Sequence, residues 1–132
     1  MIFVDTSAWV ALTARRDERH RDAVAILGQV ADEPLLTSTN VVGETWTFLN
    51  RRHGHPAAVS FVERVESSER VDLAFVGHEL EREAFEWLRR RDEREYSFVD
   101  ATSFALMRAR GVPRAFAFDG DFAAAGFSEL RR

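Results

Sequence analysis

The stretch Ile2-Phe3-Val4-Asp5-Thr6-Ser7 opens the chain and decides which fold we expect. Three apolar residues that favour strands run directly into an aspartate, and two hydroxyl residues that can open a helix follow it. In α/β proteins, ligand chemistry usually takes place at the carboxyl end of a buried strand. Asp5 is therefore either an acid placed for chemistry or a helix N-cap without a chemical role. The positions of the other acids have to decide between the two.

Short strands alternate with helices along the rest of the chain. Apolar spacing predicts further strands at 35–37, 71–76 and 115–118, and a short edge strand from 127 onward. It predicts helices at 6–16, 20–31, 39–53, from 56 through 65, 78–91 and 97–110. This alternation is typical of a three-layer α/β/α sandwich with a short central parallel sheet flanked by helices. Because no linker or repeat interrupts the pattern, we expect residues 1–132 to form a single domain.

The composition excludes several kinds of chemistry. The chain has no Cys, and all 18 Lys and Arg positions are Arg. Without Cys there is no disulfide and no thiolate metal site. Without Lys there is neither a Walker P-loop nor Schiff-base catalysis. Response-regulator receivers and haloacid-dehalogenase phosphatases also cluster aspartates, but they depend on a lysine and are excluded with them.

The charge balance is acidic, with a formal net charge of −4. This argues weakly against a nucleic-acid partner, because backbone binding usually needs a basic surface. However, the arginines come in groups, and buried or metal-bound acids would leave the exposed surface less acidic than the count. No apolar run approaches the roughly 18 residues of a membrane span, and no signal-peptide pattern opens the chain. We therefore expect a cytoplasmic protein without a membrane partner.

Five acids stand out by their positions. Asp5 follows the first strand, Asp119 follows the strand predicted at 115–118, and Asp121 lies in the same turn. Asp100 lies in the first turn of the most apolar helix and shares the face of its apolar residues. Glu44 lies at the margin of the inward arc predicted for the helix 39–53. That arc consists of Val41, Val42, Thr45, Phe48 and Leu49.

Each acid also has an interpretation without chemistry. Asp5 can cap a helix, and Ser97 to Asp100 fits a capping box. Asp119 precedes Gly120 in an ordinary turn pair, and Glu44 can pair with an arginine such as Arg51. Four such coincidences are hard to accept together, because the remaining acids lie on plainly polar stretches.

If Asp5, Glu44, Asp100 and Asp119 converge in the fold, their negative charges need a counter-charge. Two carboxylates about 4 Å apart repel by about 4 kcal/mol at an effective dielectric constant near 20. Either some of them stay protonated or a cation lies among them. Oxygen ligands alone select a hard ion, Mg²⁺ or Mn²⁺, rather than zinc. Such a site suits hydrolysis of a phosphodiester.

At this point the chain resembles a known family, the PIN-domain ribonucleases, and most closely the VapC toxins of bacterial toxin–antitoxin pairs. The resemblance covers nearly the whole chain and rests on four pieces in a fixed order. They are Val4-Asp5-Thr6-Ser7, Glu44, Ser97-Phe98-Val99-Asp100-Ala101 and Ala115-Phe116-Ala117-Phe118-Asp119-Gly120-Asp121-Phe122. The resemblance implies an α/β/α sandwich and Mg²⁺- or Mn²⁺-dependent endonuclease cleavage of RNA, leaving 5′-phosphate and 3′-hydroxyl ends.

The resemblance also implies roles for residues and partners. The catalytic acids would be Asp5, Glu44, Asp100 and Asp119. The metal ligands would be Asp5, Asp100 and Asp119, with Asp121 as a second candidate or outer acid. Thr6 and Ser97 would support the carboxylates and a water. The family further implies a homodimer and a cognate antitoxin whose tail fills the groove.

Two other functions stay open at the level of the sequence. One is a catalytically silent PIN-like binding module that docks an Arg-rich partner through its acidic pocket. The other is a glycosidase with paired carboxylates, which would need no metal. Among the tryptophans, Trp9 is the one that we expect to face a partner.

Overall fold

A computed structural model describes all residues of the chain, 1–132. Five strands form one sheet in the order β3-β2-β1-β4-β5, and every neighbouring pair is parallel. The strands are β1 (Ile2–Val4), β2 (Leu35–Ser38), β3 (Val71–Ala74), β4 (Arg114–Phe116) and β5 (Ser128–Glu129). The helices are α1 (Thr6–Thr13), α2 (His20–Gln29), α3 (Thr39–His53), α4 (His55–Ser67), α5 (His78–Arg89), α6 (Phe98–Arg110) and α7 (Asp121–Ala124).

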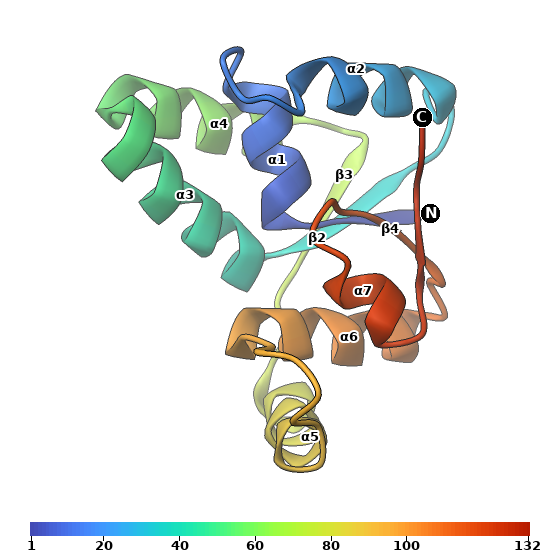
Figure 1. Cartoon of the computed structure of the whole chain (residues 1–132). Coiled ribbons are helices and arrows are strands. Elements are labelled where there is room, and N and C mark those ends of the chain that lie inside the picture. Colours follow the sequence, from blue (N-terminus) through green and yellow to red (C-terminus); the bar gives the residue numbers. More distant parts are fainter.

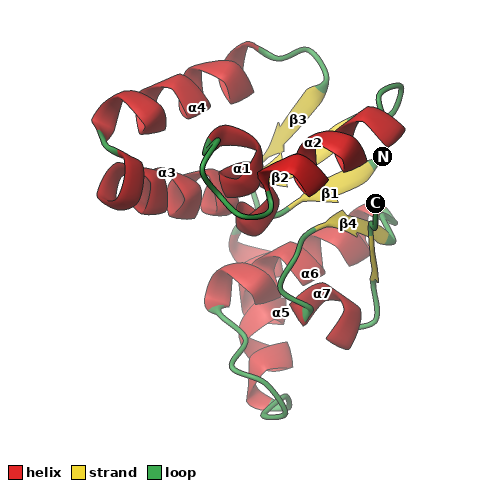
Figure 2. Ribbon diagram, turned by 45° about the horizontal axis from the view of Figure 1, so that its top comes forward, coloured by secondary structure: helices red, strands yellow, loops and turns green.

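The helices lie on both sides of this sheet. Helices α1, α2 and α4 lie together on one side with α3, and α5, α6 and α7 lie on the other (Figures 1 and 2). The predicted α/β/α sandwich with a short parallel sheet is therefore confirmed. None of the helices is both long enough and apolar enough to span a membrane.

The strand register explains why the conspicuous residues meet at one edge. Strands β1 and β2 are buried along their whole length, as expected for central strands of a parallel sheet that is covered on both faces. Val4, the last residue of β1, pairs with Phe116, the last residue of β4. Ser38 ends β2 and its Oγ accepts a hydrogen bond from the Val41 amide, which caps α3. The carboxyl ends of the three central strands therefore lead into α1, α3 and the loop before α7.

An aromatic cluster fixes α6 against the sheet. The fully buried Phe104 ring lies 5.1 Å from the Trp87 ring and 5.0 Å from the Phe122 ring, in edge-to-face contacts. Phe122 in turn lies 5.9 Å from the Phe3 ring of β1. Asp100 stands one helical turn before Phe104, on the same face of α6. The packing of Phe104 therefore also determines where the Asp100 carboxylate lies.

Two expectations about the last third of the chain were wrong. Strand β4 ends at Phe116 rather than Phe118, because the Phe118 amide donates to Ser7 Oγ (3.0 Å) instead of to a neighbouring strand. Asp121, predicted to lie in a turn with Asp119 and Gly120, instead begins the short helix α7 (Asp121–Ala124). Asp119 thus lies in a loop three residues beyond β4.

The side chains of two aromatic residues also differ from expectation. Trp9 does not face a partner, since it is 8% exposed and its Nε1 donates to Thr37 Oγ1 at 3.2 Å. Helix α3 buries a narrow stripe of Val41, Thr45 and Leu49 at four-residue spacing. Phe48, predicted inside, lies beside that stripe and is 37% exposed.

Candidate active site

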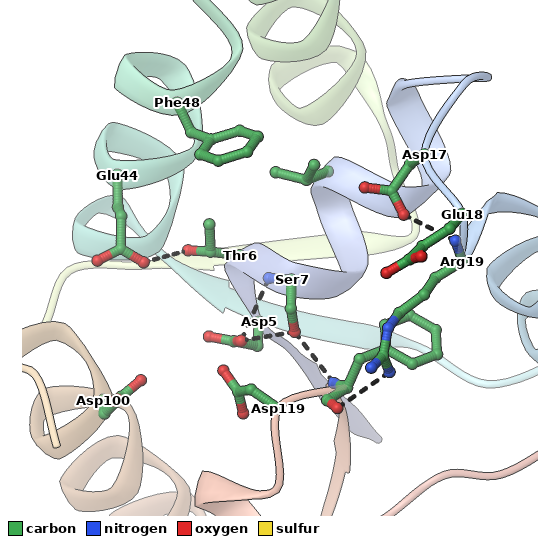
Figure 3. Close-up of a pocket in the computed structure, with 12 residues that line it drawn as sticks. Asp5, Thr6, Ser7, Asp17, Glu18, Arg19, Glu44, Phe48, Asp100 and Asp119 are labelled. Carbon is green, nitrogen blue, oxygen red and sulfur yellow. Dashed lines mark hydrogen bonds between the residues drawn. The ribbon is translucent and has the colours of Figure 1, made fainter. Parts of the chain in front are cut away.

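One cavity of about 350 Å³ opens at the carboxyl edge of β1 and β4. Asp5, Glu44, Asp100 and Asp119 all line it, although they come from four different elements of the fold (Figure 3). The remaining lining residues are Thr6, Ser7, Val10, Asp17, Glu18, Arg19, Phe48 and Phe118. The fold thus brings together the four acids that the sequence singled out.

Asp5 is the deepest of these acids and is only 2% exposed. Its Oδ2 accepts hydrogen bonds from the Ser7 amide (3.2 Å) and from Ser7 Oγ (2.9 Å), so Asp5 is the N-cap of α1. The cap is Asp5 and neither of the two hydroxyl residues after it, because the extended backbone of Asp5 is the conformation an N-cap needs. Its Oδ1 is buried without any hydrogen-bond partner. Burial raises the pKa of Asp5 to about 7, and the negative charge of Asp119 adds to the rise.

Glu44 projects from α3 toward the N-terminus of α1. Its Oε1 accepts a hydrogen bond of 2.6 Å from Thr6 Oγ1, and not an ion pair from Arg51. The hydroxyl orients the carboxylate without neutralising it, because it is an uncharged donor. Thr6 therefore sets the direction in which Glu44 faces the cavity (Figure 3).

Asp100 is both a helix cap partner and a wall of the cavity. The Ser97 amide donates to Asp100 Oδ2 (3.0 Å) and the Asp100 amide donates to Ser97 Oγ (2.9 Å), which completes the capping box. This arrangement uses one carboxylate oxygen and leaves Oδ1 unbonded. Burial raises the pKa of Asp100 to about 6, against the lowering effect of the Ser97 hydrogen bonds.

Asp119 and Asp121 lie on the loop that leads into α7. Asp119 lines the cavity and keeps part of its surface open to solvent, and its Oδ1 accepts a hydrogen bond from the Asp121 amide at 3.2 Å. Burial against the loop raises its pKa, and the charge of Asp121 contributes. Carboxylate oxygens of Asp100, Asp119 and Asp121 lie within 4.8 Å of one another. Asp100 and Asp119 belong both to this trio and to the cavity that Asp5 lines, whereas Asp121 is outside the cavity lining.

Sequence reasoning missed three residues that shape the site. Ser7 Oγ donates to Asp5 and accepts from the Phe118 amide, so it ties the loop after β4 to the acid. Its position two residues after an N-cap acid was the only available signal. Arg94 donates to Asp121 Oδ1 (2.8 Å) and to the Asp119 carbonyl (3.1 Å), and thereby holds the acidic loop. Arg19 donates to the carbonyl of Phe118 at 3.1 Å. These arginine contacts span 25 residues or more of sequence, and no local pattern predicts them.

The residues present fit a hard divalent cation. The side-chain atoms at the site that are best suited to bind a metal are carboxylate oxygens, and Mg²⁺ and Mn²⁺ prefer such ligands. A buried carboxylate oxygen without a partner, such as Asp5 Oδ1, costs free energy that a cation would recover. Burial raises the pKa values of Asp5, Asp100 and Asp119, and the negative charges of neighbouring aspartates add to each rise. A cation among these carboxylates would favour their ionised forms.

Known proteins share both the sequence and the fold of this chain. The PIN domain family model matches residues 2–128. The chain is 55% identical to the 23S rRNA-specific endonuclease VapC20 of Mycobacterium tuberculosis, over 99% of this chain and 98% of that protein. The crystal structure of that VapC20, described as a sarcin–ricin loop cleaving toxin, superposes over 100% of both chains with a TM-score of 0.94 and 54% identity. FitAcB from Neisseria gonorrhoeae shares the fold at 17% identity, with a TM-score of 0.68 over 99% of this chain and 97% of that chain. This chain therefore belongs to the PIN-domain family, and within it to the VapC endonuclease toxins.

Proposed function

We propose that this protein is a metal-dependent endoribonuclease that cleaves the sarcin–ricin loop of 23S rRNA as the toxin of a toxin–antitoxin pair. One observation carries the proposal, the unpartnered and buried Oδ1 of Asp5 in a cavity with three further carboxylates. The substrate is taken from VapC20, which is more than half identical over nearly its full length. A ribosomal substrate would also place the protein in the cytoplasm.

Asp5, Asp100 and Asp119 are the residues that would hold Mg²⁺ or Mn²⁺. When bound, such an ion polarises the phosphate, lowers the pKa of a water and stabilises the leaving oxygen. Asp121 would serve as an outer acid, because Arg94 already engages its Oδ1 and it lies outside the cavity. Ser97 keeps Asp100 in the orientation that leaves its Oδ1 unbonded.

Glu44 would act on the attacking water. Thr6 occupies Oε1 of Glu44, and Oε2 forms no hydrogen bond with the protein. A carboxylate in this position can accept a proton from a water and orient it, which is a general-base role. We assign the remaining positive charge at the cavity, Arg19, to the substrate rather than to an acid, because it forms no ion pair.

Cleavage of a labelled hairpin with the sarcin–ricin loop sequence tests the proposal. We expect one cut within the loop in Mg²⁺ or Mn²⁺, none in EDTA, and a loss of at least about 100-fold for Asp100→Asn. Asp32→Asn is the matched control, since Asp32 is exposed and distant from the cavity lining. Activity that survives chelation, or that is unchanged in Asp100→Asn, would contradict the proposal. Metal-binding calorimetry on the same variants separates an enzyme from a silent acidic docking module, which would bind divalent ions only weakly.

The toxin assignment adds two partners, a cognate antitoxin and a second copy of the chain. We infer both partners from the membership of this chain in the VapC toxins, and not from a contact in the structure. Light scattering of the purified protein, alone and with the product of the adjacent open reading frame, tests them. A monomer that inhibits growth without any neutralising partner would contradict this part of the proposal.

A further inference from the structure

Two arginine–phenylalanine pairs lie at the acidic cavity. The guanidinium carbon of Arg19 lies 5.2 Å from the centre of the Phe118 ring, and that of Arg52 lies 5.5 Å from the centre of the Phe48 ring. Phe48, Phe118 and Arg19 line the cavity itself. Figure 3 shows Phe48 above Glu44 on α3, and Arg19 on the opposite wall, in the loop before α2. The acids therefore lie between two sites that each combine an aromatic ring with a positive charge.

The pair on α3 continues the cavity along one helix face. Glu44, Phe48 and Arg52 follow each other at four-residue spacing, so they form a stripe that starts at the acids and leads away from them. A shallow pocket of Glu44, Thr47, Phe48, Arg51 and Arg52 adjoins the acidic cavity and shares Glu44 and Phe48 with it. The Phe48 ring is 37% exposed in this pocket. More than a third of the Phe48 side chain is therefore open to a ligand.

Arg51 and Arg52, which both line the shallow pocket, form no ion pair within the chain. The structure's arginine ion pairs involve Arg89, Arg91, Arg94, Arg110, Arg114 and Arg132. Basic residues in the last turn of a helix do complement its dipole, and this accounts in part for Arg51 and Arg52. It does not account for the exposed Phe48 between them and the acids. A ligand that needs both an aromatic face and a positive charge accounts for both features.

The second pair is held in place by the site itself. The Arg19 amide donates to Asp17 Oδ1 (2.8 Å), and Arg19 Nη1 donates to the Phe118 carbonyl (3.1 Å). The Phe118 amide in turn donates to Ser7 Oγ, which donates to Asp5. A guanidinium has five N–H donors, so this arrangement fixes Arg19 and still leaves donors for a phosphate. Arg19 is thus positioned relative to Asp5 through three hydrogen bonds, by way of Phe118 and Ser7.

We propose that these two pairs hold the nucleotides on either side of the scissile phosphate, with the rings stacking on unpaired bases and the guanidiniums binding flanking phosphates. The inference rests on the proposed ribonuclease function, and it specifies which form of RNA the site accepts. Aromatic rings beside cations are the usual platform for single-stranded nucleic acid. Bases within a duplex do not offer their faces, so the two platforms select an unpaired loop.

Binding of RNA by the full chain tests the inference without turnover. Fluorescence anisotropy in Ca²⁺, with a gel to verify intact RNA, compares a hairpin that has an unpaired loop with a fully paired duplex of equal length. The variants are Phe48→Leu, Phe48→Tyr, Arg52→Gln and Arg19→Gln. The matched controls are Phe85→Leu and Arg82→Gln, because Phe85 is 50% exposed on α5 and Arg82 is exposed there without an ion pair.

We expect Phe48→Leu to weaken hairpin binding roughly 5- to 100-fold, as the loss of one base–aromatic stack does, and to leave duplex binding unchanged. Phe48→Tyr keeps a ring and should bind within about threefold of the wild type. Each of Arg52→Gln and Arg19→Gln should lower the slope of log K against log salt by about 0.7, which Phe48→Leu should not do.

Two results would overturn the inference while leaving the enzyme assignment intact. One is hairpin binding by Phe48→Leu that equals that of Phe85→Leu, with wild-type cleavage retained. The other is an equal loss on hairpin and duplex, which would show a general structural effect. If instead the wild type neither binds nor cleaves RNA in any divalent metal, the proposed function itself fails, and this inference fails with it.

Discussion

Replacing Asp5 by asparagine should make the metal-free protein more stable. The wild-type carboxyl has a pKa of about 7 in the folded state, against the ordinary aspartate value of 3.8 that applies to the unfolded chain. At pH 8 it is ionised in both states, and the difference of about 3 pKa units corresponds to a folding penalty of about 4 kcal/mol. Asparagine carries no charge and can still accept the cap hydrogen bond from the Ser7 amide. Allowing for one imperfect hydrogen bond, we expect a net gain of roughly 1–3 kcal/mol.

The sign of the pH dependence follows from the same values. Because the folded-state pKa of Asp5 is raised, the folded protein binds more protons than the unfolded chain between about pH 4 and pH 7. Wild-type stability at this residue therefore falls as the pH rises through that window, and the penalty is complete above pH 7. The advantage of Asp5→Asn should be largest at pH 8 and should vanish near pH 4.

Urea unfolding in EDTA at pH 8 and pH 4.5 measures this difference directly. Asp32→Asn serves as the control, because Asp32 is exposed and has no hydrogen-bond partner. Addition of Mn²⁺ at pH 8 should stabilise the wild type and leave Asp5→Asn almost unchanged. Two results would show that burial and clustered charge do not destabilise the ionised Asp5 carboxylate. One is an Asp5→Asn protein that is no more stable than the wild type at pH 8, and the other is a gain in stability that persists at pH 4.5.

Three further predictions concern the same site. Metal affinity should rise as the pH rises from 5 to 7 and then level off. The reason is that Asp5 and Asp100, with pKa values of about 7 and about 6, must lose protons to bind the ion. Calorimetry at several pH values measures this affinity, and an affinity that does not change with pH would contradict the prediction. Thr6→Val should lower the cleavage rate roughly 10-fold while Thr6→Ser retains it, since only the hydroxyl orients Glu44; equal rates in the two variants would exclude that role. Arg94→Gln should weaken Mn²⁺ binding several-fold by releasing the acidic loop, with little change in unfolding free energy because the Arg94 side chain is 41% exposed to solvent. Unchanged Mn²⁺ affinity would show that the loop holds its shape without it.

Local sequence patterns were sufficient to place the two acids that lie at the ends of regular elements, Asp5 and Asp100. Asp5 comes directly after a run of strand-forming residues, and Asp100 lies three residues after a serine that can cap a helix. Both placements depend only on residues nearby in the sequence. In the structure Asp5 lies between β1 and α1, and Asp100 lies in the first turn of α6 with Ser97 as the N-cap. The parallel sheet then follows from alternation, and it brings the carboxyl ends of β1 and β4 to one edge.

The partners of these acids depend on distant contacts and were not predictable. Thr6 and Glu44 are 38 residues apart, and Ser7 and Phe118 are 111 residues apart. The second contact also ended β4 early, because Phe118 gave its amide to Ser7 rather than to the sheet. Trp9 was misjudged for a similar reason, since its hydrogen-bond partner Thr37 lies on β2.

The buried Oδ1 of Asp5 has no hydrogen-bond partner within the chain, and we propose that a divalent cation is its ligand. Crystals grown at pH 8 and soaked in Mn²⁺ test this directly through the anomalous difference map. We expect an anomalous peak about 2.0–2.3 Å from Asp5 Oδ1, with carboxylate oxygens of Asp100 and Asp119 as further ligands of the Mn²⁺ ion. A map without a peak in this cavity, or with the ion bound only at Asp121 on the outer loop, would contradict it.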